Sequence, residues 1–202
     1  MNLRKIVKVF IPRGLYRKVE PYGHLVEAAA LNLQKGGSPA RNLKVIGVTG
    51  TNGKTTTCFL IYQMLHKAGY KVGMMTTVGY GANGEIKPQV DHMTTVPVPK
   101  LIKRLQELKG QDIEWLVMET TSHALVQRRD WGIPYSLGVL TNMSHEHLDY
   151  HGTFERYVAA KQLLFKRVNR NRKGLRTGVV NADDKVADKF TSLVKNPLTY
   201  GI

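Results

Sequence analysis

The chain has 202 residues, of which 42% are hydrophobic and 22% are charged, and this ordinary globular composition excludes wholesale disorder. Its formal net charge of +15 predicts anionic partners, a class that includes nucleotide phosphates, nucleic acids and anionic membrane surfaces. The single cysteine, Cys58, excludes an internal disulfide and is typical of a reducing compartment, so we expect a cytoplasmic location.

Residues 1–42 are expected to form a basic helical extension ahead of the main domain. Pro21 and the Gly-rich cluster 36–39 punctuate this extension, and the apolar stretch 24–33 between them predicts one helix. No apolar run in the chain reaches the roughly 18 residues that span a bilayer, so no transmembrane segment is expected. Basic residues gather here and in 166–176 without interleaved aromatic residues, which favours solvated basic surfaces over a specific nucleic acid site.

Short apolar runs alternate with helical segments through residues 43–202, which we expect to form the main domain. This alternation predicts an α/β fold of the P-loop type, with a mostly parallel sheet and helices on both faces. The segment 80–89 contains Gly and Asn and is expected to be a loop or a hairpin. The expected strands are 43–49, 71–78, 113–119, 136–141 and 176–180, and the expected helices are 54–67, 97–108, 122–129 and 154–166.

The run VIGVTGTNGKTTT at 45–57 ends an apolar strand in a Gly-rich turn followed by Lys-Thr. Gly50 and Gly53 allow successive backbone N–H groups to face one concave site, and the helix that follows adds its positive N-terminal end. Lys54 supplies a mobile cation, and the Thr55 hydroxyl is a ligand that suits Mg²⁺. The strict P-loop pattern would have Gly at the position of Val48, so the sequence predicts a variant polyphosphate-binding loop.

Polar residues follow several of the predicted strands, at the sheet edge where ligands bind in folds of this class. Glu119 ends one strand beside the predicted loop, and a carboxylate there suits Mg²⁺. His145, His147 and His151 raise the alternative of a zinc site. Zinc is disfavoured because no cysteine accompanies them and HEHLDYH departs from the metalloprotease pattern H-E-x-x-H.

Several motifs in one order resemble the Mur ligase family over residues 43–201: GTNGKTT at 50–56, ETTSHAL at 119–125, TN at 141–142 with HLD at 147–149, AAK at 159–161 and NADD at 181–184. The segments HMTTVP at 92–97 and QRR at 127–129 resemble the members that add the third residue of the peptidoglycan stem peptide. This resemblance implies an ATP- and Mg²⁺-dependent ligase that forms an amide bond between a UDP-linked muramoyl-dipeptide and an amino acid, through an acyl phosphate.

The resemblance also implies roles for individual residues. Nucleotide contacts are expected from Gly50, Thr51, Asn52, Gly53, Lys54, Thr55, Thr56 and Asn181. Metal ligands are expected at Thr55, Glu119, His147 and Lys161, with Lys161 carried as a carbamate. The muramoyl-peptide site is expected to include Thr94, Thr95, Thr121, Gln127 and Arg129. Catalysis is expected to depend on Lys54, Glu119, His147 and Lys161.

The sequence also departs from the family. Residues 1–42 are shorter than the family's UDP-binding domain, and we expect the ATP-binding domain to be incomplete at its C-terminal end and the C-terminal domain to be missing. We therefore expect either a truncated ligase or an ATP-binding fragment that a separate polypeptide completes, with no full turnover by the chain alone. Two alternatives stay open, namely a ligase similar to folylpolyglutamate synthetase and a non-catalytic nucleotide- or nucleic-acid-binding module. Segments 92–97 and 127–129 argue against the former.

Overall fold

A computed structural model describes residues 13–89, 95–146 and 148–202. Its centre is one eight-stranded sheet with the strand order β4-β3-β2-β5-β1-β6-β7-β8. The neighbouring strands β2, β5, β1, β6, β7 and β8 are parallel to one another. Strands β3 and β4 form an antiparallel hairpin at one edge of the sheet, where β3 pairs with β2. The strands are β1 (Lys44–Thr49), β2 (Val72–Met75), β3 (Gly79–Ala82), β4 (Glu85–Pro88), β5 (Trp115–Glu119), β6 (Tyr135–Leu140), β7 (Thr177–Asn181) and β8 (Asn196–Tyr200).

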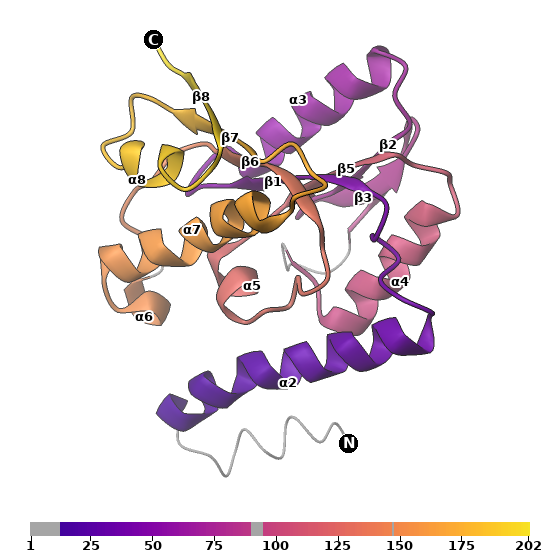
Figure 1. Ribbon diagram of the computed structural model, residues 1–202, viewed down its shortest axis with the longest axis horizontal. Helices are drawn as coiled ribbons and strands as arrows, with labels where there is room; N and C mark the ends of the chain where they lie inside the picture. The colour runs from indigo at the N-terminus through magenta and orange to yellow at the C-terminus, as the bar shows by residue number, and fades with distance from the viewer. Residues whose placement is uncertain (1–12, 90–94, 147) are drawn as a thin grey trace.

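Helices cover both faces of this sheet, which confirms the predicted fold class (Figure 1). Helix α3 packs on β1, β2 and β5 from one face, and its side chains join a cluster that includes Ile46 and Val139. Helices α4, α5, α7 and α8 lie on the other face, where the larger core cluster joins Leu105, Leu125 and Phe165. The helices of the domain are α3 (Lys54–Lys67), α4 (Val98–Lys109), α5 (Ser122–Val126), α6 (Leu148–His151), α7 (Phe154–Arg170) and α8 (Asp188–Thr191).

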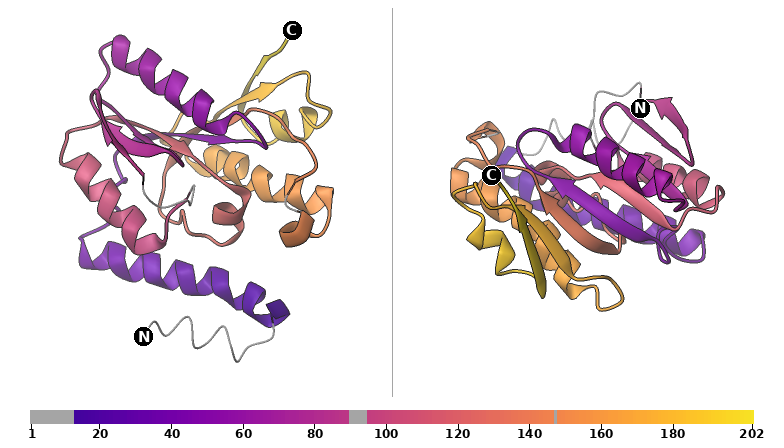
Figure 2. Two further views of the ribbon diagram at one scale, coloured as in Figure 1. Left: turned by 180° about the vertical axis from the view of Figure 1, so that it is seen from behind. Right: turned by 90° about the horizontal axis from the view of Figure 1, so that it is seen from above.

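In the described part of the N-terminal extension, residues 13–42, helix α2 (Arg13–Gln34) packs against α4 on the outside of the domain (Figure 2). It is much longer than the predicted 24–33 helix, and it continues through Pro21. The expectation that Pro21 interrupts this segment was therefore wrong. Within the described residues, no helix has both the length and the apolar character needed to cross a bilayer.

Three short elements were missing from the sequence prediction, namely α6, α8 and β8. Each is only four or five residues long, which is too short to show the apolar periodicity by which an element is predicted. All five residues of β8 are also exposed. The segment 80–89 is a hairpin, which is one of the two forms expected for it.

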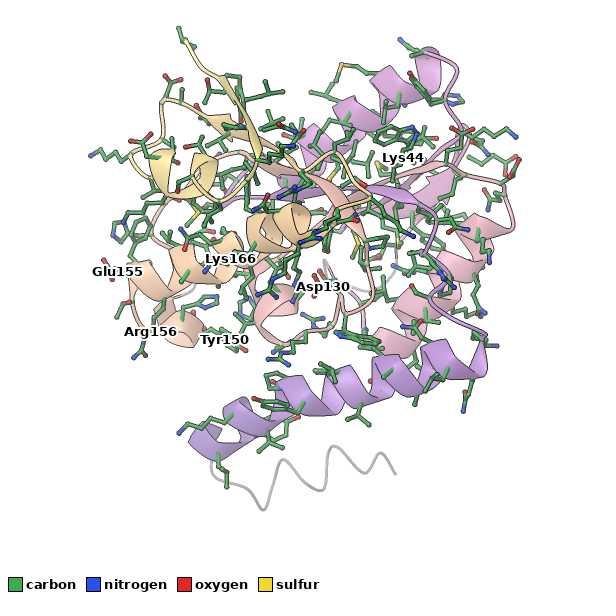
Figure 3. All side chains as sticks on the ribbon, in the orientation of Figure 1. Lys44, Asp130, Tyr150, Glu155, Arg156 and Lys166 are labelled. Carbon is green, nitrogen blue, oxygen red and sulfur yellow. The ribbon has the colours of Figure 1, made fainter. Side chains whose placement is uncertain are left out.

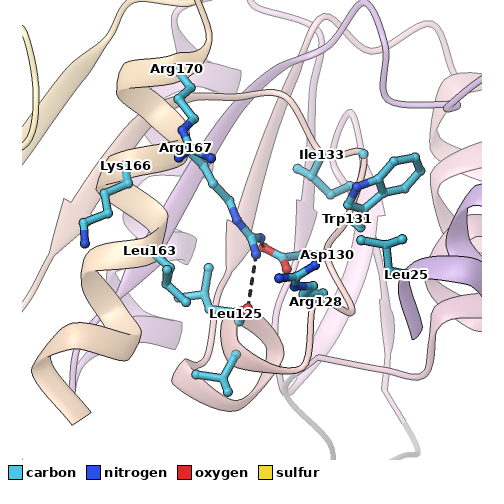
Figure 4. A pocket seen from close by; sticks show the side chains of 12 residues that line it. Leu25, Leu125, Arg128, Asp130, Trp131, Ile133, Leu163, Lys166, Arg167 and Arg170 are labelled. Carbon is cyan, nitrogen blue, oxygen red and sulfur yellow. Dashed lines mark hydrogen bonds and ion pairs between the residues drawn. The ribbon is translucent and has the colours of Figure 1, made fainter. Parts of the chain in front are cut away.

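A partly buried ion pair connects helix α7 to the loop between α5 and β6. The Arg167 guanidinium reaches from α7 to the Asp130 carboxylate, and it also donates to the Leu125 carbonyl oxygen at 3.1 Å (Figure 4). Asp130 lies inside the molecule between α5 and α7, whereas Glu155 and Arg156 point outward from the start of α7 (Figure 3). This pair holds the loop that carries the candidate residues Gln127 and Arg129.

Candidate functional site

The turn between β1 and α3 has the backbone shape that its glycines predict. Gly50 has φ 147° and Gly53 has φ 77°, and both values lie in the region that favours glycine. A Cβ on Gly50 would lie 1.8 Å from Thr141 Oγ1, so a side chain at this position would collide with the end of β6. Gly53 is the N-cap of α3, and the helix begins at Lys54, which directs the positive end of the helix toward the turn.

The segment after β6 is hydrogen-bonded to this turn. The Asn142 side chain accepts a hydrogen bond from Asn52 N at 3.0 Å and donates one to Asn52 O at 3.1 Å. It thus pairs with the backbone of Asn52 as a residue of an adjacent strand would. Thr51 N donates to Asn142 O at 2.8 Å, and Ser144 N donates to Thr51 Oγ1 at 2.9 Å. The turn is therefore held in shape by residues about ninety positions further along the chain.

Glu119 lies beside the turn, at the end of β5, and is buried. Its Oε2 accepts a hydrogen bond from Thr55 Oγ1 at 2.9 Å and from both N and Oγ1 of Thr77 at 3.0 Å. The hydroxyl and carboxylate oxygens of Thr55 and Glu119 are hard donors of the kind that Mg²⁺ prefers. The structure thus brings together two of the four predicted metal ligands.

Lys161 is buried, with only 2% of its surface exposed, and its Nζ donates to the Gly50 carbonyl oxygen at 2.7 Å. Burial, with a smaller contribution from the nearby charge of Lys54, lowers the pKa of Lys161 to about 7. Its ammonium also lies 4.5 Å from the ring centroid of Tyr157. A buried lysine directed at the turn is unusual, because most lysines on helices of this kind stay in solvent.

The remaining predicted nucleotide contacts surround the same turn. Lys54 Nζ donates to the Thr51 carbonyl oxygen at 2.7 Å, so this cation lies over the loop. Thr56 is exposed on the first turn of α3. Asn181, at the end of β7, donates through Nδ2 to the Thr141 carbonyl oxygen at 3.2 Å. The ends of β1, β5, β6 and β7 therefore meet at one edge of the sheet, where ligands bind in folds of this kind.

Four of the five predicted muramoyl-peptide residues lie near one another. Thr95 Oγ1 is 3.4 Å from Thr121 Oγ1, and Arg129 donates to the Thr95 carbonyl oxygen. The Thr121 hydroxyl also caps α5 by accepting from Ala124 N at 3.1 Å. Burial lowers the pKa of Arg129, although the nearby charge of Asp130 opposes this effect.

Gln127 connects this region to the N-terminal helix. Its Nε2 donates to Glu20 Oε2 of α2 at 3.2 Å and to the Tyr150 hydroxyl of α6 at 3.2 Å. The charge of Glu20 also acts on Arg129, so a carboxylate from the extension lies at the candidate substrate site. No local pattern indicates this contact, because 107 positions separate the two residues.

Two predicted residues, His147 and Thr94, lie outside the described residues. Within the part of the chain that the structure describes, no group of three His, Cys, Asp or Glu side chains is arranged to hold a metal ion. One residue that contacts the candidate site was overlooked, namely Thr77. It lies two residues after the end of β2, at the same edge of the sheet, and the predicted strand 71–78 extended past it.

Comparison with known proteins places this geometry in a family. Residues 48–202 match the family model described as the Mur ligase middle domain. The UDP-N-acetylmuramoyl-L-alanyl-D-glutamate–2,6-diaminopimelate ligase of Geobacillus thermodenitrificans is 41% identical over 170 residues, which are 82% of this chain and 34% of that protein. The UDP-N-acetylmuramyl-tripeptide synthetase of Deinococcus radiodurans is 38% identical over 165 residues, which are 81% of this chain and 32% of that protein. The chain thus spans about a third of the length of these relatives.

Solved structures agree at the level of the fold. A UDP-N-acetylmuramoyl-L-alanyl-D-glutamate–2,6-diaminopimelate ligase superimposes with a TM-score of 0.73 and 30% identity, covering 91% of this chain and 36% of that chain. A Mycobacterium tuberculosis folylpolyglutamate synthase complexed with ADP has a TM-score of 0.61 and 16% identity, covering 88% of this chain and 46% of that chain. The second likeness shows a shared fold alone, so the folylpolyglutamate alternative gains no functional support from it.

Proposed function

The chain belongs to the Mur ligase family, and from this premise we propose that it is the ATP-binding part of a ligase of peptidoglycan synthesis. The ligase joins an amino acid to UDP-N-acetylmuramoyl-dipeptide in the cytoplasm. The observation that carries this proposal is the contact between Thr55 and Glu119 at the mouth of the β1–α3 turn, with Lys161 bound to the same turn. Because the chain spans about a third of its relatives, we propose that further polypeptide, joined or separate, completes the enzyme.

The proposed reaction has two transfers. First, an oxygen of the dipeptide's terminal carboxylate bonds to the γ-phosphorus of ATP while the bond from that phosphorus to the bridging oxygen breaks, which releases ADP. The amine of the incoming amino acid then attacks the acyl carbon, loses a proton and displaces phosphate. Both transfers depend mainly on positioning and charge stabilisation. The turn amides, the start of α3 and Lys54 offset the phosphate charge in this scheme.

The residues at the turn fit a Mg²⁺ ion. Thr55 and Glu119 would hold it through oxygen atoms that are now 2.9 Å apart, and Thr77 donates to the same Glu119 oxygen. When bound, Mg²⁺ would supply positive charge that offsets the negative charge of the phosphates. We also propose His147 as a ligand, on the basis of the motif alone.

We propose that Lys161 carries a carbamate, as the resemblance implies. The neutral amine attacks the carbon of CO₂, an N–C bond forms, one C–O π bond opens, and a proton leaves to water. A pKa of about 7 leaves a large fraction of this amine neutral at physiological pH, which supports the step. The product is an anion in place of a cation, beside Gly50, where it could join the metal ligands.

The substrate's peptide end is proposed to bind across Thr95, Thr121, Gln127 and Arg129. The guanidinium of Arg129 can hold a carboxylate or phosphate with two parallel hydrogen bonds. The proposal that Thr94 belongs to this group rests on its place in the motif.

Calorimetric titration with Mg²⁺-ATP tests the nucleotide part of the proposal, with Lys54→Ala as the variant. The chain is expected to bind ATP weakly, and Lys54→Ala is expected to lose at least tenfold in affinity. Unchanged affinity would refute the site. Phosphate release with UDP-N-acetylmuramoyl-dipeptide and an amino acid tests the ligase part, and we expect none from the isolated chain. A steep salt dependence of DNA or RNA binding would instead favour the nucleic-acid alternative.

A further inference from the structure

One face of the sheet is only partly covered. Within the described residues, α3 is the helix on that face, and it lies over β1, β2 and β5 (Figure 2). Strands β7 and β8 extend beyond it, and α7 and α8 cover the other face of β7. A parallel sheet in an α/β protein normally has both faces covered along its whole width.

A row of apolar side chains marks the uncovered region. Val48 of β1, Val139 of β6, Val179 of β7 and Leu198 of β8 are in register, so they share one face. Val48 is fully buried and Val139 is 5% exposed, whereas Val179 is half-buried and Leu198 is 58% exposed. Apolar character therefore continues across the sheet after the cover of α3 ends.

The side of α3 next to this row is apolar as well. Tyr62 faces the β3–β4 hairpin, because its hydroxyl accepts a hydrogen bond from Gly84 N at 2.7 Å. Cys58, Ile61, Tyr62 and Leu65 face the sheet, and Met64 lies about 110° around the helix from the middle of that set, on the side away from the hairpin. Met64 is largely exposed. We call Met64, Val179 and Leu198 the apolar strip.

The dimensions of the apolar strip fit one helix. Two strand spacings separate β6 from β8, or about 10 Å, which is the diameter of an α-helix with its side chains. A helix that runs in the same direction as α3 would end at the amino edge of the sheet. Lys67, at the end of α3, and Lys195, just before β8, are exposed there and would favour the negative C-terminal end of that helix.

We propose that the apolar strip is the docking surface for an amphipathic helix from the part of a Mur ligase that lies outside the matched region. The inference rests on the proposed function, since the partner belongs to the same ligase. The relatives are about three times as long as this chain, so such an enzyme contains the necessary additional polypeptide. β8, which carries Leu198 of the apolar strip, ends at Tyr200 near the C-terminus (Figure 1), so a polypeptide attached after Ile202 would also reach this surface.

Co-expression with the portion of the Geobacillus thermodenitrificans relative that follows its matched region tests the proposal. We expect the tagged chain to co-purify with this portion as a heterodimer. Leu198→Asp and Met64→Asp are expected to weaken the association at least tenfold, because each places a charge in the apolar contact. The matched control is Leu33→Asp, at an exposed leucine of α2 on the opposite side of the sheet, and it should bind as the unmodified chain does. Thermal unfolding establishes that each variant is folded.

Association that is absent, or that survives both substitutions in the apolar strip, would overturn the inference. So would a homodimer of the chain that Leu198→Asp dissociates, because the apolar strip would then join two copies. Mg²⁺-ATP affinity is measured separately on the chain alone. Association through the apolar strip without ATP binding rejects the proposed function and keeps the docking surface, and the reverse result rejects only the docking surface.

Discussion

Substituting Gly50 by alanine tests whether the shape of the β1–α3 turn depends on the end of β6. An alanine Cβ would lie 1.8 Å from Thr141 Oγ1, and the backbone φ of 147° belongs to a region that L-residues rarely adopt. That conformation costs about 1–3 kcal/mol for a residue with a side chain. Displacing the Thr141 hydroxyl from Asn52 O, which it contacts at 2.7 Å, costs about 1 kcal/mol more.

We therefore expect Gly50→Ala to lower the free energy of unfolding by about 2–4 kcal/mol, as the sum of these two effects. For a chain of this size, a loss of about 3 kcal/mol corresponds to a fall in melting temperature of about 6–12 °C. Urea unfolding measures the free energy, and titration with Mg²⁺-ATP measures the accompanying loss of affinity.

Gly53→Ala is the matched control, since Gly53 has φ 77° but no atom within 4 Å of the position that a Cβ would occupy. It should cost only about 1–2 kcal/mol, the cost of a left-handed residue. Thr141→Ala removes the colliding oxygen, so the double variant should lose about 1 kcal/mol less than the sum of the single variants. Equal stability of the two glycine variants, together with additive effects in the double variant, would refute the reasoning.

Three further predictions concern residues around the site. Thr77→Val removes one hydrogen bond to Glu119 and should cost about 1 kcal/mol in urea unfolding and weaken the Mg²⁺ dependence of ATP binding. Glu20→Ala releases Gln127 and should tighten binding of UDP-N-acetylmuramoyl-dipeptide severalfold, as measured by calorimetry. As a free amine, without the carbamate, Lys161 has a folded pKa of about 7 against an ordinary value of 10.5, so the unfolded chain binds more protons between these values. Stability should therefore rise with pH from about 7 to 10.5, and Lys161→Met should remove that contribution.

Each of these predictions has a contrary outcome. Thr77→Ser keeps the hydroxyl and should behave as the unmodified chain does, so an equal loss would contradict the hydrogen-bond explanation. Glu27→Ala removes another carboxylate of α2, and the same gain in substrate affinity would show a general charge effect. A stability profile of Lys161→Met that parallels the unmodified chain would mean that Lys161 does not titrate in this range.

The centre of the fold was predictable from the sequence because the local signals there agree with one another. The apolar run of β1, the glycines of the turn and the periodicity of α3 placed that helix at Lys54–Lys67, as observed. Edge elements were missed for the opposite reason. β8 contains Pro197 and all five of its residues are exposed, so its place in the sheet depends on pairing with β7, which no local pattern encodes.

The site was predictable only where a motif or a strand end marked it. Glu119 was expected beside the turn because it ends an apolar strand, and its contact with Thr55 agrees with that placement. Thr77 has the same kind of position after β2 and was overlooked because the strand prediction extended too far. The contact of Glu20 with Gln127 depends on the packing of α2 on the domain, which the sequence does not specify.

The two-way bonding between Asn52 and the Asn142 side chain bears on protein engineering. Transplanting GTNGKTT alone into a foreign scaffold would leave behind the groups that shape its backbone. The unit to transplant is a pair of peptides, 49–56 and 141–144. A graft that carries both peptides should keep the backbone conformation of the turn, whereas GTNGKTT alone should lose it.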